Sequence, residues 1–301
     1  MNKKLRFCFI PYLYFKEKIY WLKANKDNLI GKDFYHFGKT IARKLLAKAV
    51  ISPKLLFNPV SIVRYFEFDF ALKNLTKYSL SNKKVLDISS PYLFGFYCAS
   101  NFDTDYTYLN PDTNDLNLVK KYSQKILNKH NFKTGTGDAA KLNYANNSFD
   151  AVISISVIEH IDNNGDMTAI KEMMRILKKD GILILTFPVS KSFVIEYSES
   201  DTYGLKVNQI NDKYFFQRVY DEKSIKERLL NNIQDFTILE QQIFGEIEQG
   251  FYSKYSDRWK KKGLLETVKD PYYISKFFDY LVSFNEIKES AVLGIALRKD
   301  K

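Results

Sequence analysis

The sequence predicts an α/β fold built around a mostly parallel β-sheet and preceded by a helical N-terminal extension. From Lys84 onward, short apolar runs alternate with segments of helical periodicity, which is typical of βαβ units. One connecting helix ends in a stop signal over Lys178–Gly181, where cations in the last turn are followed by a glycine. We therefore expect residues 1–80 to form the basic helical extension and residues 81–301 to form the α/β domain.

Composition indicates a globular protein without a disulfide framework. Of the 301 residues, 45% are hydrophobic and 27% are charged, which is ordinary for a soluble domain. Cys8 and Cys98 lie far apart and form neither a disulfide framework nor a metal cluster, so a cytoplasmic location fits best. The apolar start of the chain is interrupted at Pro11, and no stretch reaches the ~18 apolar residues of a membrane span. We expect neither secretion nor a transmembrane helix.

The net charge of +11 is concentrated at the N-terminus. Residues 1–84 contain 18 Lys and Arg against 5 Asp and Glu, whereas residues 85–188 contain 10 against 12 and residues 189–301 contain 18 against 18. A basic arm on a neutral domain indicates an anionic partner, such as a phosphate group, an acidic glycan, a nucleic acid or a membrane surface. A solvated basic helical face is an equally good interpretation.

Two helices are expected within the extension. Lys39–Val50 places an apolar stripe that begins at Ile41 opposite several lysines and an arginine. Such a basic amphipathic helix lies on a membrane surface in some proteins, but packing of the stripe on a core is commoner. The second helix, Ser61–Leu72, carries Arg64 and Glu67 among aromatic neighbours.

The first half of the α/β domain contains the regular alternation. Five strands are expected, at Val85–Ile88, Thr107–Leu109, Phe132–Thr134, Ala151–Ser154 and Ile182–Phe187. Helices are expected between them, at about Leu93–Ser100, Asp112–His130 and Met167–Lys178.

The second half departs from this alternation. A polar and aromatic segment, residues 190–220, is expected to form a lid, and a helix over Asp221–Leu230 follows it, capped by its first residue. The last two strands are expected at Phe236–Ile243 and Ala291–Arg298. Between them lies an insertion, residues 244–290, which is expected to form extra helices.

Four motifs follow one another between Gly137 and Gly181. They are Gly-Asp-Ala-x-x-Leu at Gly137–Leu142, Ser-Phe-Asp-x-Val-x-Ser at Ser148–Ser154, Glu-His-Ile at Glu159–Ile161, and Glu-x-x-Arg-x-Leu-Lys-x-x-Gly at Glu172–Gly181. Their order and spacing resemble the second half of a class I S-adenosylmethionine-dependent methyltransferase of the type 11 domain. The resemblance implies a Rossmann-like, seven-stranded sheet with helices on both faces, its last two strands antiparallel at one edge, and S-adenosylmethionine as the cofactor.

The resemblance places the cofactor at the carboxyl ends of the strands, where open parallel sheets bind ligands. After the first strand, Asp87 stands where the family has an acidic residue, and Ser89 and Ser90 stand in place of a glycine-rich turn. We expect the serine hydroxyls to replace some backbone contacts to the methionine carboxylate of the cofactor. Pro91 is well placed to open a helix whose amino end favours that anion.

The next two strand ends supply the remaining cofactor candidates. Asn110 stands where the family usually has an acid that holds both ribose hydroxyls, and Asp112 either substitutes for that acid or caps the following helix. Asp138 resembles the residue that accepts a hydrogen bond from the adenine amino group, and Ala139 supplies a backbone donor to the ring edge.

The turn after the fourth strand is expected to lie beside the sulfonium and the acceptor. Ser156 is expected to line the cofactor there, and His160 is the candidate general base for an acceptor hydroxyl, since the unperturbed histidine pKa lies near neutrality. An architectural role for His160 is the alternative, and Glu159 is expected to be structural. The reaction depends mainly on alignment of an already activated methyl group, and no metal is implied.

The lid is expected to select the acceptor. Tyr214, Arg218 and Tyr220 are the candidate substrate-binding residues, joined by Tyr203, because an arginine among aromatic side chains suits a carboxylate or phosphate. Aromatic residues at this spacing are also typical of a core.

The leading hypothesis is methylation of a small-molecule or glycan-type acceptor of anionic character, at a hydroxyl oxygen. One alternative is an RNA methyltransferase that uses the basic arm, although no RNA-binding module is recognisable. The other is a non-catalytic binding or assembly protein on the same scaffold, because Ser89–Pro91 and Asn110 depart from the family's cofactor contacts. Peripheral membrane contact through the N-terminal arm is a further expectation.

Overall fold

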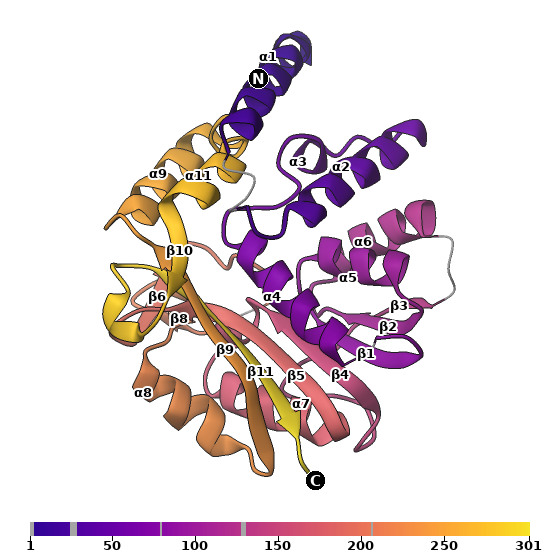
Figure 1. The fold of residues 1–301 in the computed structure, drawn as a ribbon, viewed down its shortest axis with the longest axis vertical. Coiled ribbons are helices and arrows are strands. Elements are labelled where there is room, and N and C mark those ends of the chain that lie inside the picture. Colours follow the sequence, from indigo (N-terminus) through magenta and orange to yellow (C-terminus); the bar gives the residue numbers. More distant parts are fainter. Residues whose placement is uncertain (1–2, 25–28, 79, 128–130, 206) are drawn as a thin grey trace.

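An eight-stranded β-sheet forms the centre of the molecule, with helices packed on both of its faces (Figure 1). The computed structural model describes residues 3–24, 29–78, 80–127, 131–205 and 207–301. The strand order is β10-β9-β11-β5-β4-β1-β2-β3. This is the Rossmann-like, mostly parallel arrangement that the sequence predicts.

Five neighbouring strands of the sheet are mutually parallel. They are β1 (Lys83–Ile88), β2 (Thr104–Leu109), β3 (Phe132–Gly135), β4 (Phe149–Ile155) and β5 (Leu177–Val189). The buried apolar side chains of β1, β2, β4 and β5 alternate between the two faces of the sheet, so each of these four strands contributes to two cores.

The edge beyond β5 is antiparallel. β11 (Ala291–Lys299) lies between β5 and β9 (Phe236–Glu246) and runs opposite to both. The seven expected strands are all present, and the insertion adds an eighth, β10 (Phe278–Leu281), which pairs with β9. The rest of the insertion forms helices, as expected: α9 (Phe251–Lys262), α10 (Leu264–Thr267) and α11 (Asp270–Phe277).

The N-terminal helices share the larger core with one face of the sheet. The N-terminal helices are α1 (Lys3–Lys23), α2 (Lys32–Ala47), α3 (Pro53–Phe57) and α4 (Arg64–Lys77). Two further helices follow the first two strands: α5 (Tyr92–Asn101) after β1 and α6 (Thr113–Ile126) after β2. The last residues of the predicted helix Asp112–His130 lie outside the described ranges. Ile41 and Leu45 of α2 are fully buried, so this basic helix packs its apolar stripe on the core and not on a membrane.

The opposite face is covered by α7 (Gly165–Ile176) and by α8 (Glu222–Ser224) with the helical turns that continue it to Asn232. Asp221 caps α8, as predicted, by accepting a hydrogen bond from the Ser224 amide. The helix before β5 ends at Ile176, two residues earlier than expected, because Leu177 already pairs with the start of β4. Within β5, Asp180 takes a left-handed conformation at φ 61°, and the register between β4 and β5 shifts over this segment.

The predicted lid is a small antiparallel sheet that extends from the carboxyl end of β5. It contains β6 (Val194–Ser198), β7 (Gln209–Ile210) and β8 (Lys213–Val219), in the order β6-β8-β7. A short 3₁₀ turn, Ile158–His160, follows β4 and lies beneath β8. Among the described residues, no helix is both long and apolar enough to cross a bilayer.

Candidate functional site

The strand order reverses between β1 and β4, which makes their carboxyl ends the expected ligand-binding crevice of this sheet. A serine follows each of these strands in a left-handed backbone conformation, Ser89 at φ 53° and Ser156 at φ 48°. Glycine takes this conformation freely, whereas other residues do so only when their surroundings hold them there. The two strained turns thus lie side by side at the switch point.

Hydrogen bonds hold the first turn on three sides. The Ser89 amide and hydroxyl both donate to the Leu109 carbonyl, at 2.8 and 3.0 Å, and the Ser90 hydroxyl accepts from the Ile155 amide at 3.0 Å. Asp87 accepts from the Ser90 amide at 3.0 Å. The sequence thus builds a glycine-like turn from serines, but it uses their hydroxyls within the protein.

Asp87 lies beneath this turn and is fully buried. Its second carboxylate oxygen accepts a 2.6 Å hydrogen bond from the Tyr106 hydroxyl. Burial raises the pKa of Asp87 to about 6. Its contacts are therefore with the turn and with β2, and it supports the crevice from below.

The end of β2 is tied to α6. The Asn110 side chain accepts from the Asp112 amide at 2.9 Å and donates to Asp115 at 2.7 Å and to the Tyr108 hydroxyl at 3.1 Å. Asp112 caps α6 by accepting from the Asn114 amide at 2.8 Å. Both predicted ribose contacts directly follow β2, and the structure gives both of them local structural roles.

Asp138 lies in the loop after β3, and its side chain is exposed. One of its carboxylate oxygens accepts from the Ala140 amide at 2.8 Å, which fixes the turn, and the neighbouring Ala139 is buried. The following loop is held by the Glu-x-x-Arg motif of α7. Glu172 accepts from the Leu142 amide at 2.9 Å, and Arg175 donates to the Leu142 carbonyl at 2.9 Å.

A buried polar cluster lies where β4 and β5 end. Glu67 of α4 is fully buried and accepts hydrogen bonds from Ser156, from Thr186 at 2.8 Å and from Arg64. A buried carboxylate is costly unless it is paired and hydrogen-bonded, and here three donors satisfy it. Sequence reasoning did not single out this cluster. The available signal was a charged residue on a helix of otherwise aromatic character.

Glu159 lies in the turn after β4 and is 1% exposed. Its Oε2 atom has no hydrogen-bond partner among the residues that the structure describes, and Oε1 lies 3.8 Å from His160 Nε2. Burial raises the pKa of Glu159 to about 8, so the side chain is mostly protonated at neutral pH. An unpartnered polar atom this deeply buried is unusual in a native fold.

His160 is held beneath the lid in one tautomer. Its Nδ1 atom donates to the Phe216 carbonyl at 2.7 Å, which leaves Nε2 as an acceptor, and the Tyr203 hydroxyl donates to Nε2 at 3.3 Å. Burial lowers the pKa of His160 to about 4. The ring is therefore neutral at pH 7, with a lone pair directed toward an exposed tyrosine of the lid.

Two of the predicted substrate-binding residues attach the lid to the domain. Arg218 is 3% exposed and donates to the backbone carbonyls of Ile161, at 2.6 Å, and of Asn163. Tyr220 is fully buried and donates to Asp166 at 3.0 Å. Tyr214, half-buried on β8, pairs with β6 and β7. Tyr203 therefore lies next to His160, whereas the side chains of Arg218 and Tyr220 form hydrogen bonds within the protein.

Comparison with known proteins gives one sequence match and several structural ones. Residues 92–185 match the family model described as a methyltransferase domain. No curated protein matches the chain.

Solved structures share the fold at low identity. A protein of Galdieria sulphuraria assigned as a sarcosine dimethylglycine methyltransferase is 15% identical, with a TM-score of 0.51 over 77% of this chain and 84% of that one. A methyltransferase assigned in Bacillus halodurans C-125 is 18% identical, with a TM-score of 0.50 over 77% and 99%. Coclaurine N-methyltransferase, bound to N-methylheliamine and S-adenosylhomocysteine, is 13% identical, with a TM-score of 0.50 over 76% and 69%.

Proposed function

We propose that this chain, of which residues 92–185 match a methyltransferase domain, transfers a methyl group from S-adenosylmethionine to a hydroxyl oxygen of a small-molecule or glycan-type acceptor. The observation that carries the proposal is His160, whose Nε2 atom is an available proton acceptor beside the switch point of the sheet. An alcohol must lose its proton as its oxygen is methylated, so a positioned acceptor for that proton is useful. The anionic character that we propose for the substrate rests on the basic N-terminal segment.

Three features at the carboxyl ends of the parallel strands suit the cofactor. The turn after β1 takes, at Ser89, the left-handed conformation that glycine takes freely. Helix α5 begins at Tyr92 without a side-chain cap, so its first amides suit a carboxylate. The Asp138 side chain is exposed in the loop after β3, where it suits the adenine amino group. When bound, S-adenosylmethionine supplies an electrophilic methyl group.

The chain's own residues then act on the acceptor. In the proposed arrangement, the acceptor hydroxyl takes the place of the Tyr203 hydroxyl as the donor to His160 Nε2. Burial keeps the pKa of His160 near 4, so Nε2 is unprotonated throughout the neutral range and is a weaker base than a free imidazole. As the proton moves to Nε2, the Phe216 carbonyl stabilises the imidazolium through Nδ1. Tyr203, on the exposed part of the lid, positions the acceptor and excludes water.

The test is a screen of hydroxylated, acidic acceptors for formation of S-adenosylhomocysteine, followed by His160→Gln. Glutamine can accept a hydrogen bond but cannot carry the proton away, so we expect kcat to fall by about 100-fold to 1000-fold. Cofactor affinity should stay unchanged in calorimetry. His36→Gln, the matched control at an exposed histidine of α2, should leave kcat unchanged. A product methylated at nitrogen, or a His160→Gln enzyme with normal kcat, contradicts the proposal.

A further inference from the structure

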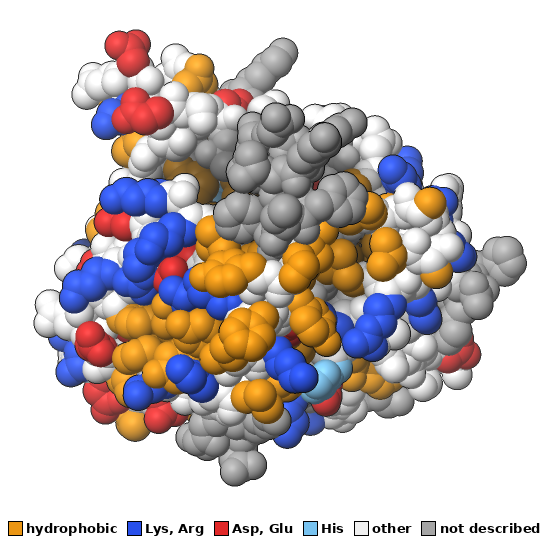
Figure 2. Space-filling view, turned by 90° about the horizontal axis from the view of Figure 1, so that it is seen from above, with side chains coloured by type: hydrophobic (Ala, Val, Ile, Leu, Met, Phe, Trp, Pro, Cys, Tyr) orange, Lys and Arg blue, Asp and Glu red, His pale blue; other side chains and the backbone are white. Residues whose placement is uncertain are grey.

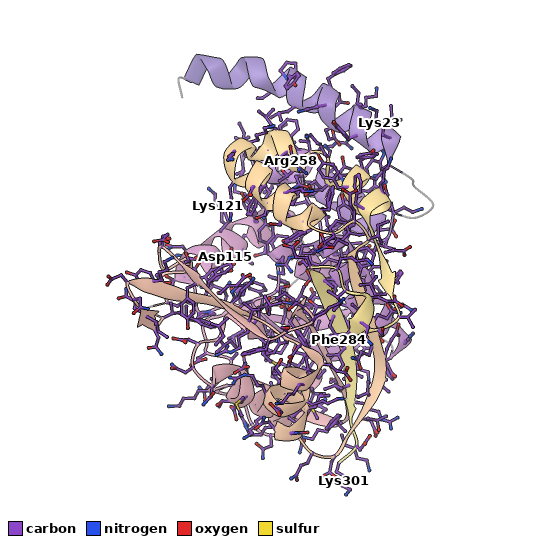
Figure 3. All side chains as sticks on the ribbon, turned by 90° about the vertical axis from the view of Figure 1, so that its left-hand side faces the viewer. Lys23, Asp115, Lys121, Arg258, Phe284 and Lys301 are labelled. Atoms are coloured by element: carbon purple, nitrogen blue, oxygen red, sulfur yellow. The ribbon has the colours of Figure 1, made fainter. Side chains whose placement is uncertain are left out.

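From Ile10 onward, where its side chains are described, helix α1 packs on the protein through one face. Leu13 is buried in a small apolar cluster with Phe57 and Val268. Glu17, on the same face, forms an ion pair with Lys39 of α2 at 3.2 Å, and Trp21 stacks on Tyr35 of α2 with 4.2 Å between ring centroids. These contacts hold α1 along the upper edge of the molecule, where it ends at Lys23 (Figures 1 and 3).

The opposite face of α1 is apolar and exposed. Tyr12, Phe15 and Leu22 are 50%, 62% and 63% exposed, and with Lys18 they recur at spacings of three and four residues, which places them on one side of the helix. Single exposed apolar residues are normal on a soluble protein, but a helix that is apolar on both faces is typically covered on both. We therefore expect a second apolar surface to cover the outward face of α1.

The charged residues of α1 indicate which kind of surface covers this face. Between Lys3 and Lys23 the helix has six Lys and Arg and a single acidic residue, Glu17, whose charge is already paired with Lys39. Seen from above, hydrophobic side chains gather on this side of the molecule with lysines and arginines among and around them (Figure 2). A second copy of α1 would bring like charges together, which disfavours pairing of two copies through this face. Aromatic rings among lysines are instead typical of helices that lie at the interface of an anionic bilayer.

We propose that α1 docks the protein on an anionic lipid surface, with Tyr12, Phe15 and Leu22 inserted at the headgroup boundary and the lysines on lipid phosphates. Helix α2, which the sequence offered as the membrane-facing helix, does not serve this purpose because its apolar stripe is buried. The proposal is independent of the methylation reaction.

The experiment is co-sedimentation of the full chain with vesicles of phosphatidylcholine alone or mixed with phosphatidylglycerol. We expect binding to the mixed vesicles only, weakening as salt is raised. Phe15→Ser with Leu22→Ser, and separately Lys18→Glu with Lys23→Glu, should each weaken binding by about tenfold or more. Both variants should melt at the wild-type temperature, since these side chains make few contacts with the domain.

Matched controls come from other exposed positions. Leu118→Ser with Val282→Ser removes exposed apolar side chains elsewhere, and Lys120→Glu with Lys121→Glu reverses the same amount of charge on α6. These variants should bind like the wild type. The proposal is overturned if the wild-type protein does not sediment with anionic vesicles, or if the controls lose as much binding as the α1 variants. It is also overturned if the α1 variants dissociate an oligomer in sedimentation velocity while vesicle binding is absent, since the face then belongs to a second copy.

Discussion

Glu67 on α4 accepts a hydrogen bond from the hydroxyl of Ser156, the residue that turns the chain at the end of β4. A side chain from the N-terminal segment thus reaches the switch point of the sheet, 89 residues away in sequence. The aromatic residues around Glu67 belong to the same core as β1, β4 and β5. The segment before residue 81 therefore shares its packing with the sheet, and Glu67 ties it to the end of β4.

Glu67→Gln should therefore destabilise the whole domain. The substitution leaves Arg64 without its ion-pair partner and gives Ser156 and Thr186 a weaker acceptor. Breaking a buried pair by removing one charge typically costs about 3 kcal/mol or more. Urea unfolding measures this change. Glu222→Gln, which breaks the exposed pair with Lys226, is the control and should cost less than about 1 kcal/mol. Equal losses from the two substitutions would show that the Glu67 cluster is not structurally important.

Ser89 provides a test of the turn after β1. Ser89→Gly relieves a left-handed strain of about 1 kcal/mol and loses a hydrogen bond of similar value, so the melting temperature should hardly change. Ser89→Val loses the same hydrogen bond and places a β-branched residue at φ 53°, which should destabilise the fold by about 2–3 kcal/mol. Because the hydroxyl already donates to Leu109, the glycine variant should keep its affinity for S-adenosylmethionine. A tenfold loss in that variant would instead assign the hydroxyl to the cofactor.

Glu159 should make the stability of the protein depend on pH. Its folded pKa of about 8 lies above the usual 4.5, so the folded protein holds a proton that the unfolded chain releases between these values. Stability contributed by this residue is therefore greatest at low pH, falls as pH rises from 4.5 to about 8, and then levels off. Glu159→Gln removes this penalty, and we expect it to stabilise the protein by about 2 kcal/mol at pH 8 and by little near pH 4.

Glu172 gives the opposite sign and serves as the control. Hydrogen bonds from Arg175 lower the pKa of Glu172, so its contribution is present above its unfolded pKa and is lost as pH falls through its folded value. Glu172→Gln should therefore destabilise the protein at pH 8 and make less difference in acid. Unfolding curves collected across this pH range compare the two variants. A Glu159→Gln protein that is less stable than the wild type at pH 8 would contradict the assigned protonation state.

The features that the sequence predicted correctly are those that depend on a local pattern of residues. Apolar runs located the seven expected strands, and the cap at Asp221 and the helices of the insertion followed from short-range rules. Asp138, Ser156 and His160 each follow a strand of the parallel part of the sheet. Because the carboxyl ends of parallel strands lie on the same side of the sheet, the sequence predicted that these residues lie on that side.

Contacts between distant segments were not predictable from pattern. The docking of Glu67 onto Ser156 and the burial of Arg218 depend on tertiary packing, which no local signal encodes. The left-handed angle at Ser89 goes against the residue's own preference and is imposed by its bonds to Leu109. The sequence offered Asn110 as a ligand-binding residue. In the structure its side chain also forms hydrogen bonds that connect the end of β2 to α6.

The most direct test of the account is calorimetric titration of the protein with S-adenosylmethionine and S-adenosylhomocysteine, for the wild type, Asp138→Ala and Asp105→Ala. Asp105 is an aspartate near the opposite end of the sheet, bonded to Lys133, and serves as the control. We predict micromolar binding to the wild type and to Asp105→Ala, and affinity reduced by at least about tenfold in Asp138→Ala, as expected for the loss of a charged hydrogen-bond acceptor. Absence of binding to the wild type, or equal affinity in all three proteins, would contradict a cofactor crevice at the carboxyl ends of β1, β2 and β3.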